Sequence, residues 1–348
     1  MNRIKRMVIP VVAFLLTAAL LLFMAQCLLV PHDASANPEG ALIGEFTDGF
    51  GAQDVLFLGD CEIYESFSTV TLWEEYGIDA WLCGSPQQLM WHSYAMLCQA
   101  FKVGTPSVVV LGVYGLRYGE PQNEAYNRMA LDGLIKTPAL AALLKDAMCQ
   151  GESLLSYYFP LLRYHDRWDE VTVRDVQLLF TKQTPVSYNG YLMQCGVLPD
   201  ADGVADHTGA LPLTDLEFGD MAVEYFDRIV SLCREKGAQL ILLKAPTDSW
   251  TYPWYEEWES ATEALAKTYE LPYYNLLEVA DKIGLDYTTD TYDAGLHLNV
   301  YGAEKTALYF GEILQNEFDV TDRRGDAVRE MIWKGTVMRY EEQKKSVD

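Results

Sequence analysis

The fold is decided by the stretch Val55-Leu56-Phe57-Leu58-Gly59-Asp60-Cys61-Glu62. Its four apolar residues make a run of the length of a buried β-strand, and the glycine and the acidic residues that follow end the strand in a polar turn. A buried strand that breaks in this way delivers the next side chain to the carboxyl edge of a sheet. We therefore expect Cys61 at the edge where parallel sheets bind their ligands.

Further apolar runs bounded by turn residues occur at 80–82, 107–113 and 240–243, and a weaker one at 273–276. Stretches long enough for helices lie between or before them, at 68–76, 87–101 and 216–236. This alternation of strand and helix predicts a parallel sheet with helices on both faces. We expect an α/β domain over residues 52–320, built as a three-layer α/β/α sandwich with a flavodoxin-like sheet.

Residues 115–215 interrupt the alternation with two helical stretches, 138–148 and 171–180, and with aromatic turns such as Tyr164-His165-Asp166-Arg167-Trp168. Thr137 followed by Pro138 is typical of a helix N-cap and first helical position. We interpret the region as a largely helical insertion that forms a cap over the site. The tail, 321–348, either packs on the domain or frays.

A second informative stretch, Asp293-Ala294-Gly295-Leu296-His297-Leu298-Asn299, precedes a helix-like run at 303–314. His297 is the natural base for a thiol, and a tight turn brings the Asp293 carboxylate within hydrogen-bond reach of the imidazole. Asp286 and Asp290 are alternatives to Asp293. A nucleophile, a base and an orienting acid are the ingredients of covalent acyl transfer. For Cys61, the competing interpretation is a small buried residue at a strand end, and for the His297–Asp293 pair it is a helix cap.

The strand ending in Gly59-Asp60-Cys61, the glycine after the second strand and the Asp293–His297 pair before the last helix resemble the SGNH/GDSL hydrolases. The resemblance covers roughly residues 54–114 and 239–318, and is greatest to membrane-anchored proteins of bacterial cell envelopes, among them polysaccharide O-acyltransferases and esterases. Three departures are visible: cysteine replaces serine, the Asp-to-His spacing is one residue longer, and no asparagine stands near Gly112 after the third strand.

The resemblance implies an oxyanion hole formed by the backbone N–H after Asp60 and that of Gly84. Because the third-strand asparagine is missing, we expect a side-chain amide from Gln87 or Gln88, or alternatively from Asn123 or Asn127. Lys244 follows the fourth strand and is expected to border the cleft, as are the aromatic residues from Trp250 to Trp258, whose rings suit a glycan. Glu62 abuts Cys61, and its charge would raise the pKa of the thiol.

The N-terminus carries Arg3, Lys5 and Arg6 and then an apolar run over residues 7–30. As a helix this run spans about 36 Å, enough to cross a bilayer core of about 30 Å. The basic flank predicts a single-pass anchor, residues 1–30, with the remaining chain outside the cytoplasm after a linker at 31–51. The alternative is a secreted protein cleaved near Ala36, after the small residues Ala34-Ser35-Ala36.

The net charge of −24 argues against nucleic acid as a partner. Seven cysteines contain no Cys-x-x-Cys pair, and His92, His165 and His207 lack ligand spacing, so we expect no metal. No phosphate loop or dinucleotide fingerprint is present, and we expect no cofactor. With Cys27 set aside, the six remaining cysteines permit three disulfides, which would remove Cys61 as a nucleophile.

The sequence supports two hypotheses. The first is an extracytoplasmic hydrolase or O-acyltransferase that acts on an acyl ester of a cell-envelope glycan through Cys61, His297 and Asp293, with a membrane-bound partner as a source of the acyl group. The second is a non-catalytic scaffold that binds glycan or assists envelope polysaccharide assembly.

Overall fold

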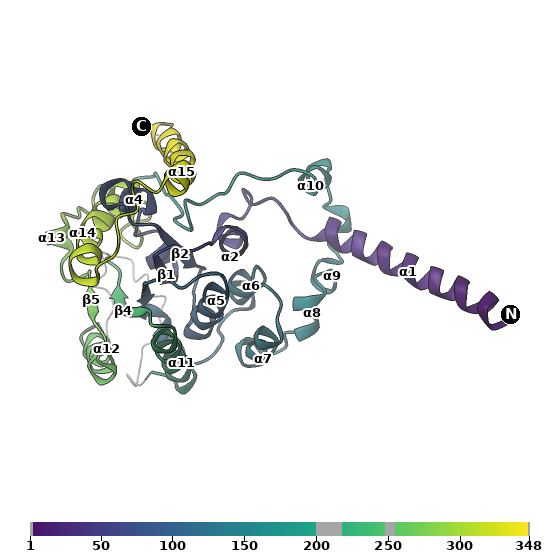
Figure 1. The fold of residues 1–348 in the computed structure, drawn as a ribbon. Coiled ribbons are helices and arrows are strands. Elements are labelled where there is room, and N and C mark those ends of the chain that lie inside the picture. Colours follow the sequence, from purple (N-terminus) through teal and green to yellow (C-terminus); the bar gives the residue numbers. More distant parts are fainter. Residues whose placement is uncertain (1–2, 200–217, 248–254, 347–348) are drawn as a thin grey trace. The chain divides into compact units, whose positions relative to one another are not determined.

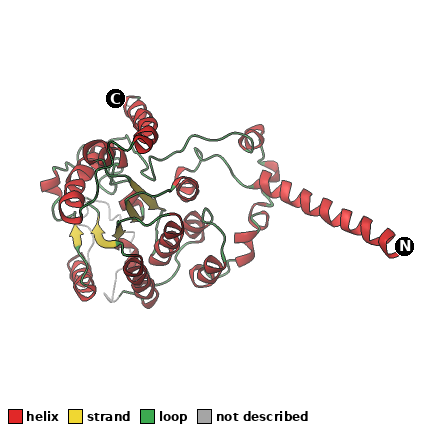
Figure 2. Ribbon diagram, in the orientation of Figure 1, coloured by secondary structure: helices red, strands yellow, loops and turns green. Residues whose placement is uncertain are grey.

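The computed structural model describes residues 3–199, 218–247 and 255–346. The fold is mixed α/β and contains a five-stranded parallel sheet with the strand order β2-β1-β3-β4-β5 (Figures 1 and 2). The strands span Val55–Gly59 (β1), Ala80–Gly84 (β2), Val108–Gly112 (β3), Gln239–Lys244 (β4) and Tyr273–Asn275 (β5). All five predicted strands are therefore present.

The order of the strands reverses between β1 and β3. The chain leaves β1 to form β2 on one side and then crosses back, so that β3 pairs with the other side of β1. In open parallel sheets a ligand binds beyond the carboxyl ends of the strands at such a switch point. Cys61 lies two residues beyond the end of β1, at this point of the sheet.

Both faces of the sheet are buried, since every residue of β1, β2 and β3 is buried and successive side chains of a strand point to opposite faces. Val55 and Phe57 of β1 pack in a core with α4 (Thr69–Tyr76) and α14 (Val300–Phe318). Helices α5 (Met90–Val103) and α11 (Asp220–Lys236) pack against each other and contact β1 and β4, respectively.

The N-terminal part of the sheet domain differs from the prediction. Residues 31–51 were predicted as a linker, but Pro38–Gly49 form helix α2, whose Leu42, Ile43 and Phe46 are buried. The sequence did not predict this helix because it contains three glycines, which disfavour helices: Gly40, Gly44 and Gly49. The sheet domain thus begins at Pro38.

The predicted insertion divides between two compact units. One unit comprises residues 38–149 and 185–348 and contains the sheet; the other comprises residues 1–37 and 150–184. The sheet unit holds η1 (Val113–Arg117), α6 (Glu124–Leu131) and α7 (Pro138–Ala147), and Thr137 caps α7 as predicted, accepting a hydrogen bond from Leu140 N–H. It also holds α12 (Tyr255–Tyr269) and α13 (Ala280–Ile283).

The smaller unit contains α1 (Arg3–Leu29) together with α8 (Leu154–Tyr158), α9 (Leu161–Tyr164), η2 (Arg167–Asp169) and α10 (Val173–Leu178). Within α1, Val8–Leu29 is apolar and long enough to cross a membrane, with a mean hydropathy of 2.7. A transmembrane span and a signal sequence both fit such a helix.

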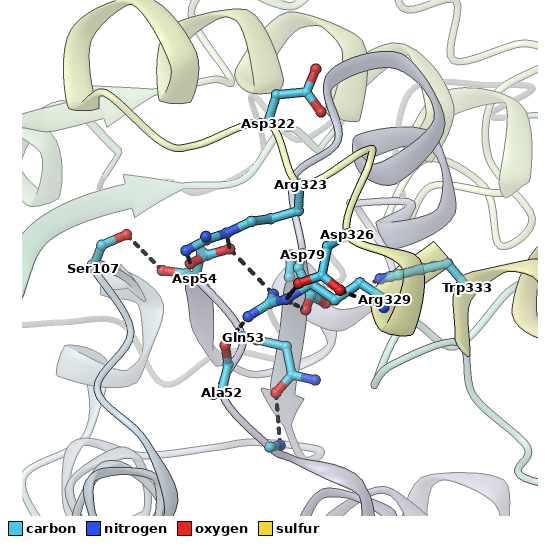
Figure 3. Close-up of polar contacts among 12 residues, drawn as sticks. Ala52, Gln53, Asp54, Asp79, Ser107, Asp322, Arg323, Asp326, Arg329 and Trp333 are labelled. Carbon is cyan, nitrogen blue, oxygen red and sulfur yellow. Dashed lines mark hydrogen bonds and ion pairs between the residues drawn. The ribbon is translucent and has the colours of Figure 1, made fainter. Parts of the chain in front are cut away.

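The C-terminal tail forms helix α15 (Ala327–Lys345), which packs on the domain through the buried side chains of Trp333 and Tyr340. Figure 3 shows the contacts at its start, where Arg329 bridges Asp79 and Asp54 while Arg323 forms two bonds to Asp54 at 2.6 and 2.7 Å. The Trp333 indole donates to Asp79 at 3.1 Å. Because Asp54 and Asp79 precede β1 and β2, this network fixes the tail to the amino ends of the strands.

Candidate active site

A pair of glycines places Cys61. Helix α3 (Cys61–Tyr64) starts directly after β1 and Asp60, and its Ile63 lies over the strand ends. A Cβ added at Gly59 would lie 2.3 Å from Ile63 Cγ1, and one added at Gly112 would lie 2.7 Å from the same atom. A larger residue at either position would clash with Ile63. The two glycines therefore let α3 pack closely over the strand ends, and Cys61, its first residue, lies at the carboxyl edge of the sheet. Ile63 also occupies the space that a third-strand asparagine at Gly112 would need.

The Asp293–His297 pair has the predicted geometry. Asp293 accepts two hydrogen bonds from His297, one from the backbone N–H at 2.8 Å and one from imidazole Nδ1 at 2.6 Å. The intervening loop turns through two residues with positive φ, Ala294 at 63° and Gly295 at 96°. With Nδ1 bound to Asp293, Nε2 is the nitrogen left to exchange a proton with a thiol.

The two alternative acids are engaged elsewhere. Asp290 is buried and pairs with Lys305 at 2.6 Å, while Asp286 accepts hydrogen bonds from the backbone and hydroxyl of Thr288. Asn299 caps α14 by accepting from the N–H groups of Tyr301 and Gly302, as its position before the helix predicts. Of the three candidate acids, Asp293 is therefore the one that hydrogen-bonds to His297, and Asn299 forms the cap of α14.

Cys61 and His297 line the same cavity, and each influences the pKa of the other. Burial raises the pKa of the Cys61 thiol to about 12, and the charge of His297 and a side-chain hydrogen bond with it act in the opposite direction. Burial lowers the pKa of His297, but Cys61, Asp293 and Glu65 together raise it well above its usual range. At neutral pH in the unliganded protein Cys61 is therefore a thiol, and His297 keeps its own proton to a higher pH than a free imidazole does.

Glu65 is a site residue that the sequence did not reveal. Its carboxylate is buried, lies 3.8 Å from His297 Nδ1, and accepts hydrogen bonds from Tyr292 at 2.9 Å and Gln194 at 3.1 Å. Burial raises its pKa to about 7. The Tyr292 ring stacks on the imidazole with centroids 6.0 Å apart. The sequence signal that could have revealed Glu65 is its spacing, because it lies four residues after Cys61, at the C-cap of α3 and about one helical turn away.

Lys244 ends β4 behind the wall of the cavity, where its Nζ contacts Glu62 and the Tyr114 ring, both of which line the cavity. Its Nζ forms a buried ion pair with Glu62 at 2.6 Å, and Lys244 is not among the residues that line the cavity around Cys61. The pairing also changes the expected effect of Glu62. The carboxylates that raise the pKa of Cys61 most are Asp60 and Glu65. Asp60 is buried, and burial followed by the charge of Glu62 raises its own pKa to about 7.

A cavity of about 410 Å³ opens at Cys61 and His297. Its volume lies within the usual range for small-molecule sites. The wall of the cavity contains four tyrosines and one arginine, and its other polar groups are carboxylates and glutamine amides. These lining residues are Glu39, Asp60, Glu62, Glu65, Gln87, Gln88, Tyr114, Arg117, Tyr118, Tyr126 and Tyr292, together with Pro86, Leu89 and Leu296.

The structure distinguishes the two candidate glutamines. Gln88 is buried, and its amide donates to the Cys83 carbonyl and the Ser93 hydroxyl. Gln87 lines the cavity with a backbone φ of 49°, and its amide makes no hydrogen bond to any residue that the structure describes. A non-glycine residue held in this region is strained, and such strain clusters at functional sites. Gln87 is thus the amide available to a ligand.

The other candidate donors lie outside the cavity wall. Gly84 ends β2, pairs with Gly59 and packs against Tyr64, since a Cβ there would lie 2.4 Å from the tyrosine ring. Asn123 caps α6, and Asn127 is buried in hydrogen bonds with His92 and Ala147. Neither asparagine lines the cavity.

The predicted aromatic cluster after β4 falls largely on residues that the structure does not describe, among them Trp250, Tyr252 and Trp254, and His207 likewise lies outside the described ranges. Of the described members, Trp258 is buried, and the Tyr255 hydroxyl donates to Glu278 at 3.2 Å and accepts from Asn275 at 2.7 Å. The tyrosines that line the cavity come instead from the segment after β3 and from the histidine loop.

Cys61 carries a free thiol in the structure and is not bridged to another sulfur. Within the described ranges, no group of three or more His, Cys, Asp or Glu side chains could hold a metal ion. Comparison with models of protein families and with curated proteins finds no match for this chain.

Proposed function

We propose that the protein transfers or hydrolyses an acyl group through Cys61 as nucleophile, His297 as base and Asp293 as the residue that orients the base. The observation that carries this proposal is that Cys61 and His297 line one cavity while imidazole Nδ1 of His297 lies 2.6 Å from Asp293. The cavity at the switch point of a parallel sheet supports it, since such sites are where these folds bind ligands.

The chemistry proceeds in two half-reactions. The reactive form has a neutral His297, which the raised pKa of the imidazole places toward alkaline pH. In this form Nε2 takes the thiol proton as the Cys61 sulfur bonds to the acyl carbonyl carbon, which compensates for the high pKa that burial gives to Cys61. The tetrahedral oxyanion accepts hydrogen bonds from the Cys61 N–H and the Gln87 amide. Its collapse breaks the ester C–O bond, and the imidazolium returns the proton to the departing alcohol. Water or a second hydroxyl then attacks the thioester carbon while His297 takes its proton. Collapse of this intermediate breaks the C–S bond and releases the acid or the new ester, and the imidazolium returns the proton to the Cys61 sulfur.

The substrate we propose is an acyl ester of a cell-envelope glycan. The tyrosines of the cavity wall, Tyr114, Tyr118, Tyr126 and Tyr292, supply flat faces and hydroxyl groups suited to sugar rings. The α1 helix supports a site in the cell membrane with the sheet domain outside the cytoplasm, and secretion after cleavage near Ala36 is the alternative. We further propose an SGNH/GDSL-like three-layer α/β/α sandwich, which the strand order and the two buried sheet faces favour.

Purified full-length chain assayed with p-nitrophenyl acetate tests the proposal. We expect Cys61→Ala and His297→Ala each to abolish turnover while leaving the circular dichroism spectrum and the melting temperature unchanged. Cys98→Ala is the matched control, because Cys98 is a partly buried thiol outside the cavity of Cys61. Turnover that survives in either site variant contradicts the proposal.

A second function, a non-catalytic scaffold that binds glycan, is favoured by one observation: burial raises the pKa of the Cys61 thiol to about 12, far from a reactive thiolate. Iodoacetamide separates the two functions. Alkylation of Cys61 that depends on His297 supports catalysis, whereas an unreactive Cys61 together with binding of envelope glycan supports the scaffold.

A further inference from the structure

The smaller compact unit joins the apolar helix α1 to a segment far along the chain. Arg167 Nη1 donates to the carbonyl oxygen of Leu29 at 2.6 Å, Gln183 exchanges hydrogen bonds with His32 and Ala34, and Arg174 pairs with Asp33 at 3.4 Å. Helix α9 also contacts α1 (Figure 1). Residues 150–184 are thus attached to the last turn of α1 and to the residues directly after it. We refer to residues 150–184 as the collar segment.

The collar segment exposes an unusual amount of apolar surface. Trp168 is 73% exposed, Val173 74% and Phe180 85%. Soluble proteins seldom leave so many large apolar side chains exposed within one short stretch, and such surfaces mark contacts with a membrane or a partner. Its exposed large apolar side chains are Leu155, Phe159, Leu162, Trp168, Val173, Val176 and Phe180.

The attachment to α1 determines at what depth in a bilayer the exposed apolar surface of the collar segment would lie. The 22 residues of Val8–Leu29 span about 33 Å as a helix, which matches the hydrocarbon core of a bilayer. When α1 spans the membrane, Leu29 therefore lies at one boundary of that core. A guanidinium bonded to the Leu29 carbonyl lies at the same level, and Trp168 is the next residue in the chain.

Composition agrees with this position. Tryptophan and tyrosine concentrate where acyl chains meet headgroups, because their rings are apolar and their N–H or O–H groups are polar. The collar segment has Tyr157, Tyr158 and Tyr164 besides Trp168, and it carries four basic and five acidic side chains in a protein of net charge −24. An almost neutral segment avoids the repulsion that the rest of the chain would meet at an anionic bilayer.

We propose that the collar segment is a membrane-interface element that lies in the lipid headgroup region beside the end of α1 and seats its exposed apolar side chains among the acyl chains. This assignment replaces the predicted cap over the site for residues 150–184. It shares with the proposed function only the assumption that α1 spans the membrane. It does not depend on the chemistry of Cys61.

Quenching of Trp168 by lipid tests the proposal. The full-length chain, with its intact mass verified, is reconstituted in nanodiscs of phosphatidylcholine brominated near the top of its acyl chains, and tryptophan fluorescence is compared with that in unbrominated nanodiscs. Helix α1 contains no tryptophan, so the helix itself contributes no signal. We expect the bromolipid to quench part of the emission, and we expect Trp168→Phe to remove most of the quenched part.

The matched control is Trp91→Phe, because Trp91 is fully buried in the sheet unit and should not contribute to the quenched fraction. Two further substitutions in one chain, Phe159→Ser and Phe180→Ser, should reduce the quenching of Trp168 by at least twofold. Equal quenching in the wild type and in Trp168→Phe, or no quenching at all, overturns the proposal, and the second result would indicate a protein partner for the surface. Esterase activity plays no part in this readout, so loss of the catalytic proposal leaves it intact.

Discussion

Lys244 and Glu62 form a buried ion pair, with Nζ 2.6 Å from Oε2, and Glu62 directly follows Cys61 in the chain. The side chains are 2% and 5% exposed, so neither charge is screened by water. The pair joins the end of β4 to α3, and it keeps an uncompensated negative charge away from the thiol.

Lys244→Met should leave Glu62 buried without its cation. Removing one partner of a buried pair typically costs about 3–5 kcal/mol, so we expect a loss of unfolding free energy in this range, measured by denaturant titration. The double variant Lys244→Met with Glu62→Gln should recover most of the loss, because no lone charge remains. Equal stability of the single and double variants would contradict this account.

Asp293→Asn should preserve the loop but lose the carboxylate that fixes the His297 tautomer. We expect kcat for p-nitrophenyl acetate to fall by about 10³–10⁴-fold with a small change in KM, as for orienting acids in other triads. Asp290→Asn serves as the control, since Asp290 bonds to Lys305 and not to His297. Similar losses in both variants would assign Asp293 no special role.

Glu65→Gln should change the pH dependence of the base. The Glu65 carboxylate stabilises the imidazolium form of His297 and so raises its pKa; the neutral amide lowers that pKa, and free base becomes available at lower pH. We expect the acid limb of the kcat/KM profile to move down by about one pH unit. The effect should be largest above pH 7, because Glu65 itself titrates at about 7.

The control for this shift is Glu259→Gln. Glu259 is also a buried glutamate that accepts a tyrosine hydroxyl, from Tyr273 at 2.8 Å, but it lies outside the cavity. Its substitution should leave the pH profile in place. A profile that does not move in Glu65→Gln would show that the carboxylate has no influence on the base.

Two substitutions at Gln87 separate the effect of its amide on activity from the effect of its strained backbone on stability. Gln87→Ala keeps a Cβ at φ 49° but removes the amide, so kcat should fall by about 10²-fold with little change in stability. Gln87→Gly removes both the amide and the strain, so it should show the same loss of kcat together with a gain of about 1 kcal/mol in unfolding free energy. A normal kcat in both variants would exclude Gln87 from the oxyanion hole.

The attachment of α15 can be measured by a double-mutant cycle. Arg329→Ala should destabilise the protein by about 3 kcal/mol, because Asp79 and Asp54 then face each other without this cation. In the background of Asp79→Asn, which retains an acceptor for the Trp333 indole, the same change should cost about half as much. Additive costs would mean that Arg329 and Asp79 act independently.

The strands and the acid–base pair could be predicted because their signals are local. Apolar runs that end at Gly59, Gly84 and Gly112 are readable without tertiary contacts, and Asp293 and His297 sit on one loop only four residues apart. The same reasoning found the cap of α7 at Thr137. In each case the interacting groups lie within one element or one turn of it.

The misses involve groups that tertiary structure brings together. Glu65 became a site residue through Tyr292 and Gln194, which are far along the chain. The ion pair of Lys244 with Glu62 forms between the end of β4 and α3, so the sequence did not indicate it. The division of the insertion depends on hydrogen bonds such as that from Arg167 to Leu29. None of these contacts leaves a periodic signal in the sequence.

The packing of Ile63 between Gly59 and Gly112 has a consequence for redesign. An asparagine introduced at position 112, to supply a third oxyanion donor, would clash with Ile63 unless Ile63 were replaced by a smaller residue. That replacement would weaken the packing of α3, the helix that begins with Cys61. Replacing Cys61 with serine asks for no such rearrangement. Under the proposed function, a serine nucleophile therefore needs one substitution, whereas an asparagine donor at position 112 needs two coupled substitutions.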